Sequence, residues 1–233
     1  MNTLVTYKIV SDQNGKLKTT GKIACNFWNK FISPNRSIVI RLGIFTRIGN
    51  TIAESYKPYK GTDGVVYGRI DFNTKYLGTF SENQIAGTIV HEIGHTLGFG
   101  WDEWMSLFDE DNGHFYATSI KKLPGLADML VETDYGPGTT LSHWDEEKFG
   151  GELMTGFKNS VEHVLPITID VIALLGHKVI ERLTTKTSLN TLLNALQSVQ
   201  FSQIDEAKSL DRDHFVQTEI WEEIYTDKRS KHI

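Results

Sequence analysis

The sequence predicts an α+β fold, in which an N-terminal twisted mixed sheet with helices precedes a smaller and less regular C-terminal part. Two observations predict it. Strand-like runs alternate with helical patterns over residues 1–98, and the stretch 99–142 is rich in Gly, Asp and aromatic residues but has little periodicity. The 233 residues suffice for one large domain with an extension. We therefore expect one domain over residues 1–182, divided near residue 98, and a helical extension over 183–233.

The strands of the N-terminal part are expected where β-branched residues cluster between turn signals. The turn signals are Asn14-Gly15, Pro34-Asn35 and Gly49-Asn50. One helix is expected between the first two strands because its large apolar residues fall on one side. The predicted elements are strands at 4–10, 37–47 and 64–73, a shorter candidate strand at 51–56, and a helix at 21–32.

The segment 82–97 is the clearest helix in the sequence. Ser81 and Gln84 form an S-x-x-Q capping box, which starts a helix, and Gly98 is well placed to end it. At about 100° per residue one face of this helix is apolar. That face comprises Ile85, Ile89, Ile93 and Leu97, with Ala86 and Val90 beside it.

The opposite face of the same helix carries a pattern typical of metal chemistry. His91 and His95 are four residues apart, so their imidazoles lie one turn apart and both reach a single ion. Glu92 is rotated by about 100° from His91, close to such an ion but free to hold a water molecule. This H-E-x-x-H arrangement is that of zinc hydrolases, and it predicts one Zn²⁺ per chain.

A catalytic zinc needs a third protein ligand, and the residues alone leave several candidates. In the compact pattern H-E-x-x-H-x-x-G-x-x-H the third histidine would occupy position 101, which is Trp101 here. A carboxylate ligand would give a site of the thermolysin type. The candidates are Asp102, Glu103, Glu110, His114 and, much further along the chain, His143, which is followed by Met154.

Three motifs together resemble the metzincins, and specifically the leishmanolysin-like zinc peptidases. They are HEIGHTLG at 91–98, SHW at 142–144 and ELMTG at 152–156. In that family an insertion follows the helix motif, the third histidine stands in an S-H-W context, and a Met-turn comes next. The segments YGPGT at 135–139 and ITIDVIALLGHKV at 167–179 add to the resemblance, which covers about residues 84–180.

The resemblance implies a metzincin-like fold and a zinc-dependent endopeptidase. His91, His95 and His143 would bind zinc, Glu92 would act as general base, and Met154 would form an apolar floor beneath the metal. An extended substrate is expected to pair with the strand at 64–73, because an edge strand binds peptide backbone irrespective of side chains. The expected substrate-binding residues are Tyr67, Gly68, Arg69 and Ile70 on that strand, and Phe157 and Asn159 after the Met-turn.

The C-terminal third of the chain is expected to be mostly helical. Amphipathic patterns predict helices at 166–179 and 213–226. Before this part of the chain, the weakly periodic stretch 99–142 offers one short helix near 120–131. Within 187–199 a further apolar stripe is too short to be stable alone and must pack against something. Its members are Leu189, Leu192, Leu193, Leu196 and Val199. We expect residues 183–233 to dock to a partner protein or a second copy.

Composition excludes several classes of protein and partner. The formal net charge is −5, which disfavours a general nucleic-acid binder. The single cysteine, Cys25, rules out an internal disulfide framework and is expected to be an inert thiol rather than a zinc-blocking thiolate. No apolar run is long enough to span a membrane. The acidic run 109–113 fails the calcium-loop register and is expected to be a solvated loop.

The sequence leaves alternatives for both the location and the function of the protein. The N-terminus lacks the pattern of a signal peptide, so we expect a protein that is cytoplasmic, virion-associated or exported by another route. The alternative function is a structural or interaction component of a larger assembly that retains the fold. The intact Glu92 argues against it, since a purely structural zinc has no need of this carboxylate.

Overall fold

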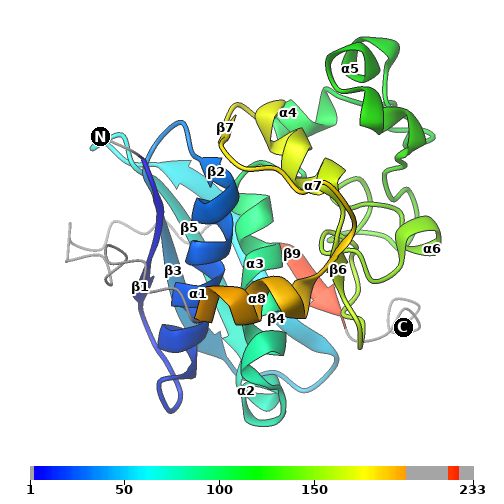
Figure 1. Ribbon diagram of the computed structural model, residues 1–233. Coiled ribbons are helices and arrows are strands. Elements are labelled where there is room, and N and C mark those ends of the chain that lie inside the picture. The colour runs from blue at the N-terminus through cyan, green and yellow to red at the C-terminus, as the bar shows by residue number, and fades with distance from the viewer. Residues whose placement is uncertain (1–2, 198–219, 226–233) are drawn as a thin grey trace.

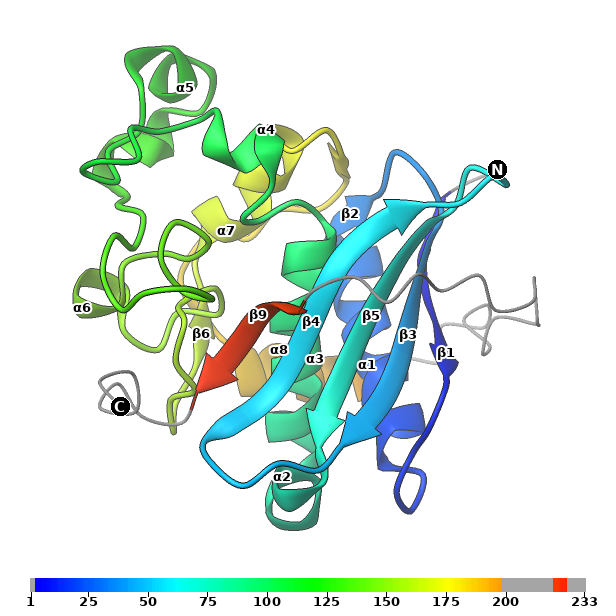
Figure 2. The same cartoon turned by 180° about the vertical axis from the view of Figure 1, so that it is seen from behind.

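The computed structural model describes residues 3–197 and 220–225 and is a mixed α+β structure. Five strands form one twisted sheet in the order β1-β3-β5-β4-β9 (Figures 1 and 2). The first three are mutually parallel, whereas β4 runs antiparallel to both of its neighbours. The strands are β1 (Val5–Ile9), β3 (Ile38–Phe45), β4 (Thr51–Lys60), β5 (Val66–Asn73) and β9 (Ile220–Tyr225). The strands predicted at 4–10, 37–47, 51–56 and 64–73 are confirmed.

Two long helices cover one face of this sheet. They are α1 (Lys16–Phe31) and α3 (Glu82–Thr96), and the short α2 (Thr74–Thr79) lies between β5 and α3 (Figure 1). The helices are tied together in the core, where Trp28 Nε1 donates a hydrogen bond of 2.9 Å to the carbonyl of Val90. Because Trp28 is fully buried, that bond also satisfies a polar group that would otherwise be costly in the interior.

Local sequence explains where these helices begin and end. α1 starts five residues earlier than predicted, because the carboxylate of Asp12 accepts hydrogen bonds from the backbone N–H groups of Leu17 and Lys18. The predicted capping box at α3 is confirmed, with Ser81 and Gln84 each bonded to the backbone of the other. Gly98 follows α3 with φ at +124°, a conformation that favours glycine.

The C-terminal subdomain consists of short elements joined by long loops. An aromatic cluster holds it together around Trp104, whose ring lies within 4.6–6.0 Å of the rings of Phe99, Phe108, Phe115 and Trp144. The short helix predicted near 120–131 is split into α5 and η1. The helical elements are α4 (Asp102–Met105), α5 (Ala117–Lys122), η1 (Pro124–Asp128), α6 (Glu146–Phe149), α7 (Pro166–Asp170) and η2 (Val171–Ala173).

The prediction of one helix over 166–179 is wrong in its length. Only α7 and η2 are helical, and the chain then reaches Gly176, whose φ is +91°. Beyond it β7 (Lys178–Val179) pairs antiparallel with β2 (Ile32–Ser33). A glycine in this conformation ends a helix, and the pairing with a segment nearly 150 residues earlier is a tertiary contact that helical periodicity does not reveal.

The prediction of a helix over 213–226 is also wrong for the part that the structure describes. Residues 220–225 form strand β9, which pairs antiparallel with β4; residues 213–219 and 226 lie outside the described residues. The segment IWEEIY contains two β-branched and two aromatic residues, and a segment this short fits a strand as well as a helix. The unpaired edge that β4 offers decides between them.

The leucine stripe of the C-terminal segment is covered within the chain itself. After β8 (Thr187–Ser188), which pairs with β6 (His163–Val164), helix α8 (Leu189–Gln197) packs across α1 and α3 (Figure 1). Leu189, Leu193 and Leu196 are at most 3% exposed. Each such buried leucine contributes roughly 1.5–3 kcal/mol. This face of α8 is therefore part of the core and is not available to a partner; Val199 lies outside the described residues.

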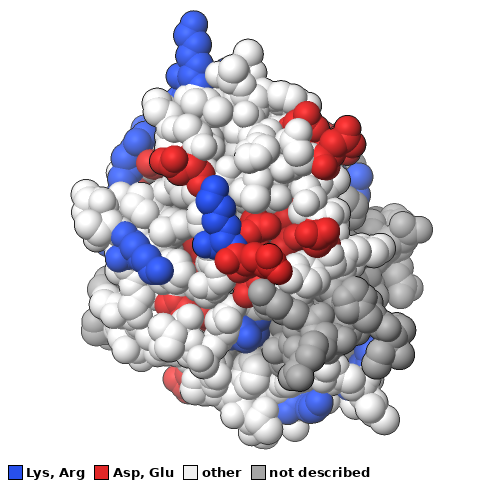
Figure 3. All heavy atoms as spheres, turned by 90° about the vertical axis from the view of Figure 1, so that its right-hand side faces the viewer, with Lys and Arg blue, Asp and Glu red and all other residues white. Residues whose placement is uncertain are grey.

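The surface of the C-terminal subdomain carries an acidic area. Figure 3 views the molecule from this side, and Asp and Glu side chains gather near the centre of the face while Lys and Arg lie scattered around them. Such an area attracts cations and cationic segments of other molecules. Among the described helices, none is long and apolar enough to cross a membrane.

Candidate metal centre

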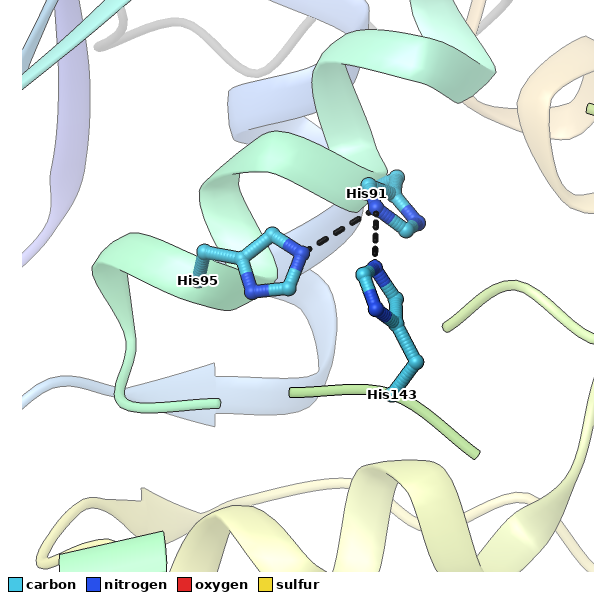
Figure 4. Close-up of side chains that lie close together, drawn as sticks. All are labelled: His91, His95 and His143. Atoms are coloured by element: carbon cyan, nitrogen blue, oxygen red, sulfur yellow. Dashed lines mark hydrogen bonds between the residues drawn. The ribbon is translucent and has the colours of Figure 1, made fainter. Parts of the chain in front are cut away.

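Three histidines from two distant parts of the chain meet between the subdomains. His91 and His95 lie one turn apart on α3, and His143 comes from the loop before α6 (Figure 4). The Nε2 atom of His91 lies 3.1 Å from that of His95 and 3.3 Å from that of His143. All three side chains are buried, and as a group they could hold a metal ion. Figure 4 shows the three rings directed toward one another.

The far nitrogen of each imidazole contacts a backbone carbonyl. Nδ1 of His91 lies 2.7 Å from the carbonyl oxygen of Leu153, that of His95 lies 3.2 Å from Phe99, and that of His143 lies 3.0 Å from Thr139. A carbonyl only accepts, so each Nδ1 carries the proton and donates it. Each Nε2 then directs a lone pair at its two neighbours, which is the arrangement that a shared cation stabilises.

The protein interior also keeps the two imidazoles of α3 neutral. Burial, with a smaller contribution from His143, lowers the pKa of His91 well below its ordinary value. Burial, together with the neighbouring His91 and His143, lowers the pKa of His95 in the same direction. Metal ions bind the unprotonated nitrogen, so these shifts favour metal binding over protonation at neutral pH.

Glu92 accompanies this cluster on the same turn of α3. Its side chain is completely buried, as both carboxylate oxygens are inaccessible to solvent. A carboxylate is costly to bury, so its retention beside two histidines calls for a reason beyond packing. The predicted role as general base supplies such a reason and stays a prediction.

Met154 packs directly against the helix that carries the first two histidines. A Cβ atom added to Gly94 would lie 2.6 Å from the sulfur of Met154, so the glycine lets Met154 approach the helix closely. Met154 is fully buried, and its carbonyl accepts a 3.0 Å hydrogen bond from the backbone N–H of Trp144. The Met154 segment is thereby fixed beside His143, and its role as an apolar floor beneath the metal stays a prediction.

Glu152 is a site residue to which the sequence analysis assigned no role. Its buried carboxylate accepts hydrogen bonds from Thr168 Oγ1 at 2.7 Å, from the N–H of Met154 at 2.6 Å and from the N–H of Leu165 at 3.1 Å. Thr168 Oγ1 also accepts from Trp144 Nε1 at 2.9 Å. Glu152 thus clamps the Met154 loop, whose Leu153 carbonyl holds His91. The one feature of the sequence that could have pointed to Glu152 is a carboxylate directly before the apolar pair Leu153-Met154.

Burial makes Glu152 sensitive to pH, which gives a first prediction. Burial raises its pKa from 4.5 to about 7, against the opposing effect of the hydrogen bonds from Thr168, Met154 and Leu165. Because the pKa of the folded state exceeds that of the unfolded state, the stabilisation is complete below about pH 4.5 and is lost as pH rises through about 7. The loss should amount to about 3 kcal/mol of unfolding free energy.

Glu152→Gln removes this titration, so the stability difference between wild type and variant should change across that pH window. Chemical denaturation at a series of pH values measures it. The variant is expected to be less stable than the wild type at low pH, because its amide nitrogen cannot accept the hydrogen bonds that the carboxyl group accepts, and the difference should shrink as pH rises through about 7. A difference that stays constant from pH 4 to 8 would show that burial does not perturb this carboxyl.

The rival third ligands lie elsewhere. Asp102, Glu103, Glu110 and His114 are exposed and do not belong to the histidine cluster. The acidic run 109–113 forms a turn closed by its own backbone, where the N–H of Gly113 donates to the carbonyl of Asp109 at 2.8 Å. Cys25 is fully buried in α1, and burial raises the pKa of its thiol, as expected for an inert residue.

Phe157 and Asn159 lie in a well-packed segment after Met154. Phe157 is buried against the ring of Tyr135, with ring centroids 5.2 Å apart. Asn159 Nδ2 donates to the carbonyl of Phe157 at 3.1 Å. Tyr135 has a φ of +69°, an uncommon conformation for a residue other than glycine. Their part in substrate binding stays a prediction.

The expectation that residues 64–73 form an edge strand is wrong. β5 is paired with β3 on one side and with β4 on the other, so Tyr67, Gly68, Arg69 and Ile70 have no free backbone edge for a peptide. β5 instead supports α3 closely, since a Cβ on Gly68 would lie 2.6 Å from Thr96 Oγ1. Strand order is a long-range property that the pattern of one strand does not contain.

No family model matches the chain, and no curated protein matches it in sequence. The resemblance to the leishmanolysin-like peptidases therefore depends on short sequence motifs, chiefly the three at 91–98, 142–144 and 152–156. The fold brings parts of all three together, since His91 bonds the carbonyl of Leu153, Met154 lies against Gly94, and His143 meets both histidines of α3.

Proposed function

We propose that the protein is a zinc-dependent endopeptidase of the leishmanolysin-like metzincin type, with Glu92 as the general base. The observation that carries the proposal is the convergence of three buried imidazole nitrogens, each held by a carbonyl at its far side. His91 and His95 belong to an H-E-x-x-H helix, and His143 is contributed from far along the chain. Met154 beneath that helix would be the Met-turn residue of this class.

The residues present suit zinc better than other metals. Zinc accepts neutral imidazole nitrogens in a tetrahedral arrangement, and catalytic sites supply three protein ligands and leave one position open. Calcium and magnesium prefer oxygen ligands, which this cluster does not offer. Among the described residues the group contains three histidines and no fourth His, Cys, Asp or Glu, so it matches a catalytic site rather than a closed structural one.

The chemistry would divide between the ion and the chain. A bound Zn²⁺ lowers the pKa of water and polarises the peptide carbonyl. Glu92 would accept a proton from the attacking water and pass it to the leaving amine. The carbonyls of Leu153, Phe99 and Thr139 would keep the three imidazoles in one tautomer and orientation, so that their lone pairs need no reorganisation. The acidic face of the C-terminal subdomain would favour cationic substrates (Figure 3).

Metal removal and a peptide-library digest test this function together. The zinc-loaded protein should cut peptides, lose this activity on treatment with a chelator, and recover it with about one equivalent of Zn²⁺ per chain. Mass spectrometry of the digest identifies the cleaved bonds. Cleavage that persists after complete zinc removal would contradict the proposal, and so would a zinc-loaded protein that cuts nothing in a diverse library.

A further inference from the structure

The edge of the sheet nearest the C-terminal subdomain is occupied by the chain's own C-terminal strand. In the order β1-β3-β5-β4-β9, strand β9 is the last, and without it β4 would present a free edge (Figure 2). β9 pairs antiparallel with β4, with Glu223 opposite Glu54 and Ile224 opposite Ala53. A segment from near the end of the chain thus supplies the outer neighbour of a strand near its beginning.

β4 also lies beside the helix that carries the histidines. Strand β4 contacts α3, and the Nζ atom of Lys57 on β4 lies 5.3 Å from the centre of the Trp101 ring. Trp101 Nε1 in turn donates a 2.6 Å hydrogen bond to the carbonyl of His95. A peptide lying along β4 would therefore run next to the candidate metal centre, which β5 does not allow.

The candidate metal centre is closed to solvent in this structure. His91, Glu92, His95 and His143 are at most 2% exposed. A peptide bond cannot reach the carboxylate of Glu92 in this arrangement, so some part of the chain must move before a substrate binds. The β4–β9 ladder is a suitable part, because its register is interrupted between Thr51 and Ala53 and again between Ser55 and Tyr56. The ladder is locally disrupted at each interruption, so fewer regular hydrogen bonds hold β9 to β4.

We infer that residues 220–225 act as an intramolecular competitor of the peptide substrate, because they occupy the outer edge of β4, where an extended peptide would lie beside the candidate metal centre. The expected effect of this competition on catalysis rests on the proposed function. An extended peptide adds to a sheet edge through main-chain hydrogen bonds, and β9 uses the same donors and acceptors of β4. Because β9 is tethered to the chain, its effective concentration is high, and a substrate binds only to the fraction of molecules in which β9 has left.

Proline substitution in the full-length protein separates backbone pairing from side-chain effects. Adjacent residues of a strand direct their N–H groups to opposite sides, so one of Glu222 and Glu223 donates toward β4. The double variant Glu222→Pro/Glu223→Pro removes that donor, whereas the control Glu222→Ala/Glu223→Ala removes the same side chains and keeps both N–H groups. Far-UV circular dichroism and zinc content verify that each variant is folded and loaded.

Two measurements report on the pairing of the β4 edge and on peptide cleavage. Hydrogen exchange of the amides of residues 51–56 should become about tenfold faster in the proline variant, the factor expected when one or two net backbone hydrogen bonds are lost. The kcat/KM for a short peptide should rise by about the same factor. The alanine control should match the wild type in both. A synthetic IWEEIY peptide added to the proline variant should restore protection of residues 51–56 and inhibit cleavage.

The outcomes separate this inference from the proposed function. A folded, zinc-loaded proline variant whose kcat/KM is unchanged or lower than that of the wild type would overturn the inference, as would unchanged exchange over residues 51–56. If the added peptide protects residues 51–56 but no form of the protein cleaves any peptide, the peptide-binding edge stands and the protease function fails. If the double variant does not fold, Glu222→Pro and Glu223→Pro tested singly replace it, and only one of them should act.

Discussion

Replacing Glu92 with alanine is expected to reduce peptide cleavage by at least about 10²-fold, the lower end of what a positioned general base supplies. The metal should remain, because His91, His95 and His143 provide the nitrogen ligands and Glu92 is not among them. Steady-state kinetics on one peptide identified in the library digest, together with zinc analysis of the same sample, measures both quantities. The loss should fall mainly on kcat, since a proton transfer is made only in the transition state.

Two control variants make this result specific. Glu110→Ala removes an exposed carboxylate outside the cluster and should leave kcat and zinc content unchanged. Glu92→Gln keeps the size of the buried side chain without its basicity, and should be as inactive as the alanine variant. Turnover within a few-fold of wild type in either Glu92 variant would remove this residue from the mechanism.

Replacing His143 with alanine is expected to lose most of the bound zinc and with it the cleavage of peptides. Two imidazoles on one helix turn leave a zinc ion short of the three protein ligands that catalytic sites use. A fall in affinity of at least about 10²-fold is expected, because even loss of a residue that supports a ligand costs 10–100-fold. Competition with a chromogenic chelator gives the affinity directly.

His114→Ala is the matched control, since His114 is exposed and lies in the same subdomain. It should retain wild-type zinc affinity. The result that contradicts the assignment is a His143→Ala protein that binds zinc as tightly as the wild type while His114→Ala, Asp102→Ala or Glu110→Ala does not.

Local signals in the sequence predicted the helix at the centre of the site. Ser81 and Gln84 mark its start, Gly98 marks its end, and the spacing of His91 and His95 directs both imidazoles to the same side. All of these act within one or two turns, so they are readable without knowledge of the fold. The meeting of His143 with this helix is different, because 52 residues separate it from His91. The spacing of the residues alone did not exclude the other candidate third ligands, and only the family resemblance pointed to His143.

The wrong predictions share one physical cause, because pairing between segments far apart in the sequence decided the structure there. Residues 220–225 became a strand because β4 offers an edge, and residues 178–179 became one because Ile32–Ser33 lie beside them. Glu152 was overlooked for a related reason. Two of its partners, Leu165 and Thr168, lie 13 and 16 residues further along, and no local pattern links a carboxylate to them. Sequence periodicity indicates which face of a helix or strand is buried, but it does not indicate which other segment packs against that face.

The position of the metal in a crystal of the zinc-loaded protein tests the central claim most directly. Diffraction data collected on both sides of the zinc absorption edge should give one strong anomalous peak per chain. We expect it about 2.0–2.1 Å from the Nε2 atoms of His91, His95 and His143, the usual distance from zinc to imidazole nitrogen. A peak bound by other residues, or no peak at these three nitrogens in protein that contains zinc, would contradict the claim.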